Sequence, residues 1–351
     1  MLIIKIKEKM KKISILLGFI TLLTSTVFAM DHAKEVNIFS ARHYDSDVQL
    51  YKKFTDKTGI KVNVVTGKDK ALLKRITEGG KDSKADLYIT ADAGRLGAAQ
   101  DKGLFQRGAN SSGIEKAVSA NFRTAYWTGI AKRARVIYYN PSKTTMPSDF
   151  SYEDLADAQY KGKVVIRQSN NVYNQSLVAS LIKNNGEKKT AQWAKGIVSN
   201  FARPAKGNDR AQILAVAAGE ADYAVANTYY IALMLSGQKG AEQQAAAKKV
   251  KPFFPNQADR GTHMNISGGG ILKNAPNKAN AIKLLEFLVT PEAQEHIVNN
   301  TFEYPIIDGV KPNNLIAQFG LDFKQDMKTK VSAYYKNQAK ALKIMTEAGW
   351  N

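Results

Sequence analysis

The sequence predicts an α/β protein in which helices connect the strands of a parallel sheet. Short apolar runs of strand length alternate along the chain with amphipathic runs of helix length. The helical segments between successive strands are long enough for the crossovers that parallel strands require. The composition, with 44% hydrophobic and 23% charged residues, is ordinary for a globular protein, and 351 residues allow one large domain or two of medium size.

The expected elements alternate regularly from residue 36 onwards. The first strand covers residues 36–39, where Val, Ile and Phe favour half-buried, pleated backbone. A helix over 48–54 ends near Gly59, because glycine readily adopts the left-handed conformation that terminates helices. The other expected elements are strand 61–65, helix 71–77, strand 86–89, helix 95–101, strands 164–166 and 223–226, and an exposed helix over 241–249.

Charge and cysteine content exclude several kinds of site. The chain has no cysteine, which rules out disulfides, thiolate zinc sites, iron–sulfur clusters and cysteine nucleophiles. Any metal site must therefore use nitrogen and oxygen ligands. Lys and Arg outnumber Asp and Glu by 51 to 31, so the surface is expected to attract anions.

The N-terminal segment is typical of a secretory signal peptide. Two lysines precede an apolar run over 13–23, which is too short to span a bilayer as a mature helix, and a small residue, Ala29, stands at the cleavage position. We therefore expect residues 1–29 to be removed after Ala29 and the protein to be exported to the periplasm, with Met10 as an alternative start. Cleavage would remove five lysines and one glutamate and leave a net charge of +16.

Tyrosines follow three of the expected strands near the points where the strands end. Tyr44 follows the first strand, Tyr173 lies a few residues beyond strand 164–166, and Tyr229 and Tyr230 come directly after the next strand. Ligands of open α/β sheets bind outside the carboxyl ends of the strands, so we expect the three loops to face one cleft. Adjacent residues on a strand point to opposite faces, so Tyr229 and Tyr230 can meet one ligand only in a loop or at a helix start.

A cluster of phenols suits a hard cation of high charge. The phenol pKa is about 10 in water, and a nearby trivalent cation favours the ionised form. Phenolate is a hard oxygen donor that suits ferric iron better than zinc or copper. Two other interpretations stay open on these residues alone: half-buried tyrosines with hydrogen-bonded hydroxyls, and an aromatic cage for an ammonium group.

Five segments give the sequence a resemblance to a known family. They are 40–45 (Ser-Ala-Arg-His-Tyr-Asp), 127–130 with 133–137, 171–176, 227–230 (Asn-Thr-Tyr-Tyr), and 260–263 with 265–268. As a set, they resemble the periplasmic ferric-iron-binding proteins, the solute-binding components of iron ABC transporters, also called bacterial transferrins. The resemblance extends from about residue 36 to residue 304.

The resemblance implies a two-lobed type II periplasmic-binding-protein fold, with a ligand cleft between lobes that are joined by crossing strands. The implied first lobe comprises residues 30–130 and 264–314, and the implied second lobe comprises 131–263 and 315–351. The chain would cross near 130–132 and near 260–264. The helices after about Asn314 would pack on the second lobe.

The resemblance also implies a ligand set for one Fe(3+) ion per chain. His43 and Tyr44 would come from the first lobe, and Tyr173, Tyr229 and Tyr230 from the second. Four phenolates with a neutral imidazole would give the ferric site a net negative charge, which a nearby cation would offset.

The same resemblance bears on the roles of two further residues, Asp92 and Arg203. Some members of the family add a first-lobe glutamate and an exogenous anion, but here the corresponding strand end reads Thr90-Ala91-Asp92. The chain therefore resembles the tyrosine-rich subgroup, which needs no accompanying anion, with Asp92 as an alternative ligand. Arg203 resembles a family position near the site, where its fixed charge would offset the phenolates, and a surface arginine is the alternative interpretation.

The implied function is capture without catalysis. A monomeric periplasmic protein, not embedded in the membrane, would bind ferric iron and deliver it to an inner-membrane ABC permease with a cytoplasmic ATPase. Motif searches agree that it is not an enzyme: the sequence has no Gly-x-Ser-x-Gly elbow and no His-Glu-x-x-His helix. The glycine run 268–270 lacks the Lys-Ser/Thr of a phosphate loop and favours close backbone packing instead.

Two other function classes remain open. A binding protein of the same fold for a small anion or carboxylate would suit the basic chain. A basic periplasmic enzyme or nucleic-acid binder is less favoured, because the lysines are scattered over expected helix surfaces rather than interleaved with aromatic residues along one stripe. We therefore expect no nucleic-acid partner.

Overall fold

The computed structural model describes residues 34–42, 44–108 and 110–351. The elements reported below all lie in one compact unit, Glu35–Asn351. The expected signal peptide over 1–29 and the expected ligand His43 lie outside the described residues. Within the described ranges, no helix has the length and apolar character needed to cross a membrane.

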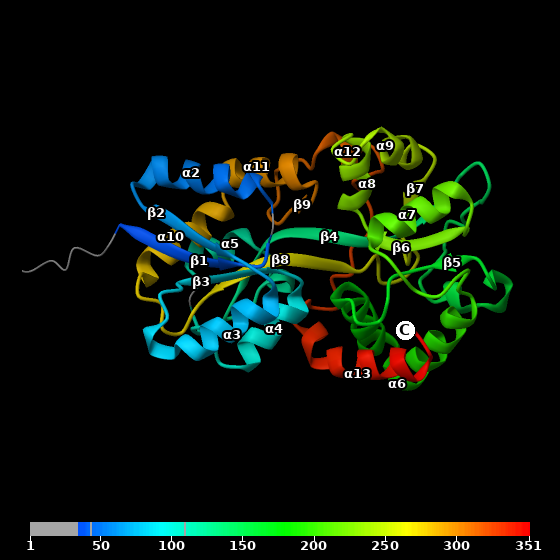
Figure 1. Ribbon diagram of the computed structural model, residues 1–351, viewed down its shortest axis with the longest axis horizontal. Helices are drawn as coiled ribbons and strands as arrows, with labels where there is room; N and C mark the ends of the chain where they lie inside the picture. Colours follow the sequence, from blue (N-terminus) through cyan, green and yellow to red (C-terminus); the bar gives the residue numbers. More distant parts are fainter. Residues whose placement is uncertain (1–33, 43, 109) are drawn as a thin grey trace, which may run out of the picture. The chain divides into compact units, whose positions relative to one another are not determined.

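The unit is built from strands and helices that alternate along most of the chain (Figure 1). The strands are β1 (Glu35–Ser40), β2 (Lys61–Thr66), β3 (Leu87–Ala91), β4 (Thr128–Tyr139), β5 (Val164–Val165), β6 (Tyr223–Asn227), β7 (Lys251–Phe253), β8 (Met264–Ile271) and β9 (Tyr304–Pro305). The α-helices are α2 (Ser46–Thr58), α3 (Asp69–Gly79), α4 (Ala93–Asp101), α5 (Ser112–Ala117), α6 (Val172–Ser199), α7 (Asp209–Ala218), α8 (Tyr229–Leu235), α9 (Ala241–Ala247), α10 (Lys278–Leu288), α11 (Pro291–Thr301), α12 (Asn314–Ala317) and α13 (Ala333–Glu347).

The strands and helices expected from the sequence all form. Those expected up to residue 101 correspond to β1, α2, β2, α3, β3 and α4, and the later ones to β5, β6 and α9. Gly59 ends α2 in the left-handed conformation, with φ of 70° and its N–H donated to the Thr55 carbonyl at 2.8 Å. The structure thus confirms the alternation read from the hydrophobic pattern.

The sheet is mixed rather than wholly parallel. Its hydrogen-bonded path runs β2-β1-β3-β8-β4-β6-β5, and β7 and β9 also pair with β4. β1 is parallel to β2 and β3, and β5 is parallel to β6, as predicted. However, β8 is antiparallel to β3 and β4, and β4 is antiparallel to β6, so the expectation of a parallel sheet is wrong around these two strands. Antiparallel neighbours need no helical crossover between them, so strand–helix alternation alone does not reveal them.

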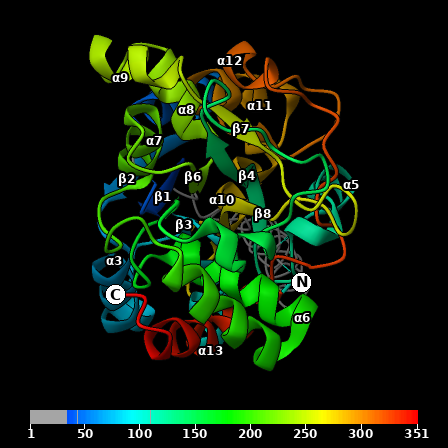
Figure 2. The ribbon, with the colours of Figure 1, turned by 90° about the vertical axis from the view of Figure 1, so that its right-hand side faces the viewer.

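β4 and β8 run side by side through the middle of the unit, with β1 to β3 toward one end and β5 to β7 toward the other (Figure 1). The first expected crossing, at 130–132, lies inside β4, and the second, at 260–264, leads into β8. After Asn314, α13 packs along α6, as both views show (Figures 1 and 2), and it also contacts α4. The lobe boundaries given above stay a prediction.

The glycine run in β8 sits where backbones approach closely. A Cβ atom on Gly270 would lie 2.7 Å from both the Phe105 ring and the Tyr126 carbonyl oxygen, and one on Gly268 would lie 2.6 Å from the Thr128 carbonyl oxygen. Side chains would therefore separate β8 from its neighbours. The structure confirms that this run serves packing.

A second close approach joins α4 to α13. A Cβ atom on Gly97 would lie 2.3 Å from the Tyr335 Cβ, so Gly97→Ala would force the two helices apart. We expect this variant to lose about 1–3 kcal/mol of unfolding free energy, as overpacking typically costs. Urea denaturation would measure the loss as a lower midpoint at an unchanged slope. In the control variant Gly113→Ala the new Cβ has its nearest contact at 3.6 Å, and an unchanged midpoint in Gly97→Ala relative to this control would contradict the expectation.

Candidate functional site

The expected site tyrosines lie at the ends of strands and the starts of helices. Tyr44 follows β1 and precedes α2, and Tyr173 is the second residue of α6, whose first turn is capped by the Asn171 side chain accepting from the Tyr173 N–H at 3.1 Å. Tyr229 and Tyr230 are the first two residues of α8. The adjacent pair therefore sits at a helix start, the placement that allows both rings to reach one ligand.

These four tyrosines line one pocket of about 800 Å³. The Tyr229 hydroxyl donates to the Tyr173 hydroxyl at 3.4 Å, and the Tyr229 and Tyr230 rings lie 4.2 Å apart between centroids. Three segments far apart in the sequence thus bring four phenols together, as the strand-end argument predicted. Their role as metal ligands stays a prediction.

Burial keeps three of these phenols, those of Tyr44, Tyr229 and Tyr230, protonated in the absence of a cation. Burial raises the pKa of Tyr44 well above its ordinary value, and the nearby Glu303 raises it further. Burial also raises the pKa of Tyr229, with further increases from Tyr173 and Tyr230. The pKa of Tyr230 is raised by burial first and then by Asp209. A strongly charged cation bound among them would favour the ionised form of these three phenols and displace their protons.

Arginine side chains flank the tyrosine rings. The Arg42 guanidinium lies 4.4 Å from the Tyr44 ring centroid, and the guanidiniums of Arg133 and Arg167 lie 5.3 and 5.6 Å from the Tyr173 ring centroid. Arg42 and Arg133 are buried, and these contacts place positive charge where ionised phenols would otherwise accumulate negative charge.

Glu303 holds the two buried arginines in place. Its Oε2 lies 2.6 Å from Arg42 Nη1 and its Oε1 lies 3.5 Å from Arg133 Nη1, while Asp47 Oδ2 lies 3.0 Å from Arg42 Nε. Sequence reasoning missed this cluster. The available signal was the run 132–139, in which Arg133 and Arg135 alternate with apolar residues on a strand that is otherwise typical of a core.

Arg203, expected near the site, does not line the tyrosine pocket. Its Nε lies 2.7 Å from Glu220 Oε1, and its Nη2 donates to Gln212 Oε1 at 3.3 Å. The side chain is therefore paired on the α7 side of the unit. The arginines that contact the tyrosine rings are Arg42, Arg133 and Arg167.

Asp92, the alternative ligand, is fully buried at the start of α4 and does not line the pocket. Its Oδ1 accepts from the Gly94 N–H at 2.8 Å and from the Ser176 hydroxyl at 2.7 Å, and its Oδ2 accepts from Asn265 Nδ2 at 2.8 Å. The carboxylate thus caps the helix and joins α4 to α6 and β8, which accounts for its burial.

Other metal-binding chemistry finds no support in the described ranges. They contain no group of three or more His, Asp or Glu side chains that could hold a metal ion. His263, buried beside Ser180, has its pKa lowered by burial and by Arg135, and its Nδ1 lies 3.1 Å from the Ser180 hydroxyl.

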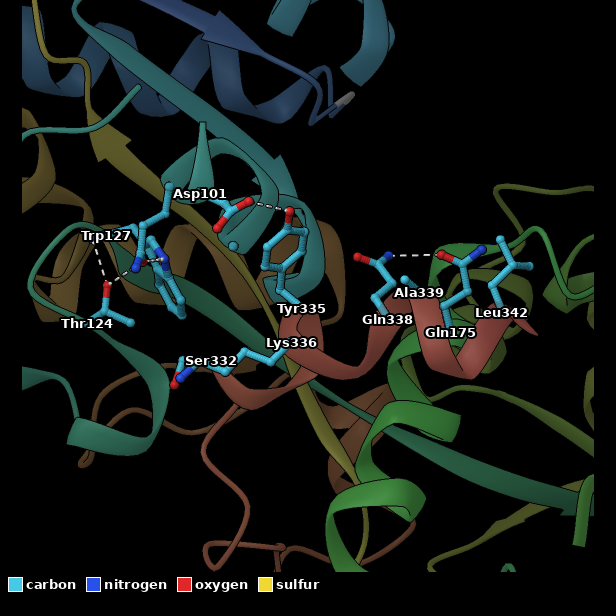
Figure 3. A pocket seen from close by; sticks show the side chains of 12 residues that line it. Asp101, Thr124, Trp127, Gln175, Ser332, Tyr335, Lys336, Gln338, Ala339 and Leu342 are labelled. Carbon is cyan, nitrogen blue, oxygen red and sulfur yellow. Dashed lines mark hydrogen bonds between the residues drawn. The ribbon is translucent and has the colours of Figure 1, made fainter. Parts of the chain in front are cut away.

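A second cavity, of about 740 Å³, lies between α4 and α13 and contains none of the expected site residues (Figure 3). Six of its polar side chains pair with one another: Tyr335 donates to Asp101 at 3.0 Å, Gln338 donates to Gln175 at 2.9 Å, and the Trp127 indole donates to Gln100 at 2.9 Å. The cavity therefore offers little unpaired chemistry, and the tyrosine pocket is the stronger candidate site.

Comparisons with known proteins show the family of the chain. A family model for bacterial extracellular solute-binding proteins matches residues 82–326. Iron uptake protein A1 of Synechocystis sp. (strain PCC 6803) is 49% identical over 319 residues, covering 90% of this chain and 88% of that protein.

Solved structures extend the likeness to the fold. Trichodesmium IdiA (FutA) in complex with iron and citrate ligands superposes with a TM-score of 0.87 at 52% identity, covering 90% of this chain and all of that one. The ferric binding protein from Campylobacter jejuni gives a TM-score of 0.83 at 40% identity, covering the same shares. These matches confirm the type II periplasmic-binding fold expected from the sequence. The chain belongs to the family of bacterial extracellular solute-binding proteins.

Proposed function

We propose that this protein binds ferric iron in the periplasm and delivers it to an inner-membrane ABC permease with a cytoplasmic ATPase. The observation that carries the proposal is the convergence of four tyrosines, from three loops distant in sequence, on one pocket. Phenolate oxygens are hard donors that suit Fe(3+). The names of the relatives, an iron uptake protein and ferric-binding proteins, support the same cargo.

In the proposed complex, one Fe(3+) per chain is bound by the phenolates of Tyr44, Tyr173, Tyr229 and Tyr230, with His43 as a further donor. The ion would bind first to the tyrosines of α6 and α8. Closure of the two proposed lobes, 30–130 with 264–314 and 131–263 with 315–351, would then add Tyr44.

The flanking guanidiniums lower the electrostatic cost of placing four phenolates in one buried site. With a neutral imidazole, four phenolates outweigh the charge of a trivalent ion, and uncompensated charge is costly away from water. Arg42, Arg133 and Arg167 lie against the rings and place positive charge beside the phenols, while each also pairs with a carboxylate of Asp47, Glu303 or Asp209. We therefore assign to these residues the role that the sequence likeness gave to Arg203.

The proposed role is transport without turnover, because the relatives are solute-binding transport proteins. Export through a signal peptide cleaved after Ala29 places the protein in the periplasm, where it would act as a monomer. We propose no nucleic-acid partner for this protein and no membrane-spanning segment in its chain.

One observation favours a second candidate, a binding protein for a small anion or carboxylate. Besides Arg42, four basic residues line the same pocket near the tyrosines: Lys68, Lys70, Arg95 and Lys239. This rim would attract an anionic ligand, but it would equally attract an anionic iron chelate.

A visible absorption titration of purified, metal-stripped protein with ferric citrate tests the proposal. We expect a phenolate-to-iron charge-transfer band that saturates at one iron per chain. Metal-free citrate and phosphate serve as controls. The absence of a band, with no thermal stabilisation by iron, would overturn the proposal, and stabilisation by metal-free citrate or phosphate in that case would favour the anion-binding alternative.

A further inference from the structure

Arg135 touches both tyrosine-bearing segments that follow β5 and β6. It lies on β4 with only 1% of its surface exposed. Its Nη2 donates to Asn174 Oδ1 at 2.6 Å, and its Nη1 donates to Asn227 Oδ1 at 3.0 Å. Asn174 directly follows Tyr173, and Asn227 stands two residues before Tyr229. One guanidinium therefore joins the two segments next to their tyrosines.

Asp209 extends this link to the Tyr173 ring. Its Oδ1 accepts from Arg135 Nη1 at 3.0 Å and from the Asn227 N–H at 3.2 Å. Its Oδ2 lies 2.5 Å from Arg167 Nη1, and the Arg167 guanidinium lies over the Tyr173 ring. The same network thus contacts the Tyr173 segment through two arginines and the Tyr229 segment through side-chain and main-chain groups.

Two features of the network exceed what charge neutralisation requires. Asp209 has Arg167 as a second cationic partner, so its burial does not depend on Arg135 alone. The other two side-chain acceptors of Arg135 are neutral amides, each within two residues of a tyrosine. A planar guanidinium presents its donors in a fixed fork, so contacts from separate nitrogens restrict the distance between the groups they hold.

We propose that Arg135 is a positioning residue that fixes the spacing between Tyr173 and the Tyr229–Tyr230 pair before iron arrives. The inference rests on the proposed function of the pocket. Because the three phenols are already arranged, iron binding does not include the entropic cost of ordering two loops. The arrangement also sets the geometry of the phenolate–iron bonds. Arg135 itself acts through Asn174 and Asn227 and does not contact the ion.

Asn227→Ala is the sharpest test of this role. The Asn227 Oδ1 accepts from Arg135, while its Nδ2 has no hydrogen-bond partner among the described residues, so the substitution deletes one link and no other side-chain hydrogen bond. Arg135→Lys keeps the buried charge but replaces the fork by a single ammonium group. Arg123→Lys is the matched control, because the Arg123 Nε donates to the Val118 carbonyl at 2.9 Å and the residue lines no part of the tyrosine pocket.

The measurements are the charge-transfer maximum of the ferric complex and the rate of iron loss to a competing chelator. We expect Asn227→Ala and Arg135→Lys to shift the band and to release iron about 10- to 100-fold faster, the range typical when a group supporting a metal ligand is lost. Circular dichroism and thermal melts of the iron-free proteins would show that the fold is retained. Arg123→Lys should leave the band and the release rate unchanged.

The outcomes separate the two proposals. Suppose that the wild-type protein shows the band and that Asn227→Ala has the same band and the same release rate. This result would overturn the role of Arg135 and leave the proposed iron binding intact. The absence of a band in the wild-type protein would overturn the proposed function and the role of Arg135 together. If Arg135→Lys does not fold, Asn227→Ala alone decides.

Discussion

Replacing Tyr229 and Tyr230 together by phenylalanine is expected to abolish tight ferric-iron binding and the charge-transfer band. The double variant removes two of the four proposed phenolates from the start of α8, so the loss of affinity should exceed the about 100-fold effect of removing a supporting contact. The fold should survive, because phenylalanine keeps both rings and their 4.2 Å contact. The hydrogen bond lost between Tyr229 and Tyr173, at 3.4 Å, is long and contributes about 1 kcal/mol or less.

Competition with a chelator of known iron affinity, read together with the visible spectrum, measures this effect. Tyr335→Phe is the matched control, since its hydroxyl binds Asp101 in the cavity between α4 and α13, away from the tyrosine pocket. This control should bind iron like the wild type. Full affinity in the double variant would remove Tyr229 and Tyr230 from the ligand set.

Iron affinity is expected to fall steeply as the pH falls. The raised pKa values of Tyr44, Tyr229 and Tyr230 keep these phenols protonated in the iron-free protein, so each must lose a proton when it binds the ion. Each ionising phenol then weakens the apparent affinity about tenfold per pH unit of acidification. Chelator competition from about pH 6 to pH 8, corrected for the protonation of the chelator, gives the slope. Iron binding without proton release in a weakly buffered solution would contradict phenolate ligation.

Through the same tyrosines, pH affects the stability of the iron-free fold in the direction opposite to its effect on iron affinity. A tyrosine whose pKa is raised by folding favours the neutral form in the folded state. Its stabilising contribution is therefore fully present below the unfolded pKa of about 10 and is lost as the pH rises through the folded pKa. Acidification should consequently release iron without weakening the fold through these tyrosines. A melt of the iron-free protein over the same pH range separates the two effects.

The sequence by itself determined the alternation of strands and helices and the strand-end positions of the tyrosines. Both are local properties, because side-chain periodicity distinguishes a strand from a helix within a short window. The convergence of Tyr44, Tyr173 and Tyr229 on one pocket followed from a general rule about where ligands bind in α/β sheets rather than from any contact visible in the sequence. The family resemblance added the iron, and the relatives support it.

The tertiary structure alone decided which charged groups surround the tyrosines. Arg203 resembles a family position but pairs with Glu220. Arg133, buried on β4, lies over the Tyr173 ring, and Arg135, buried on the same strand, pairs with Asp209. The antiparallel pairing of β4 with β6 and with β8 brings these residues together with segments far away in the chain. Burial of an arginine depends on distant partners such as Glu303 and Asp209, and no local pattern specifies those partners.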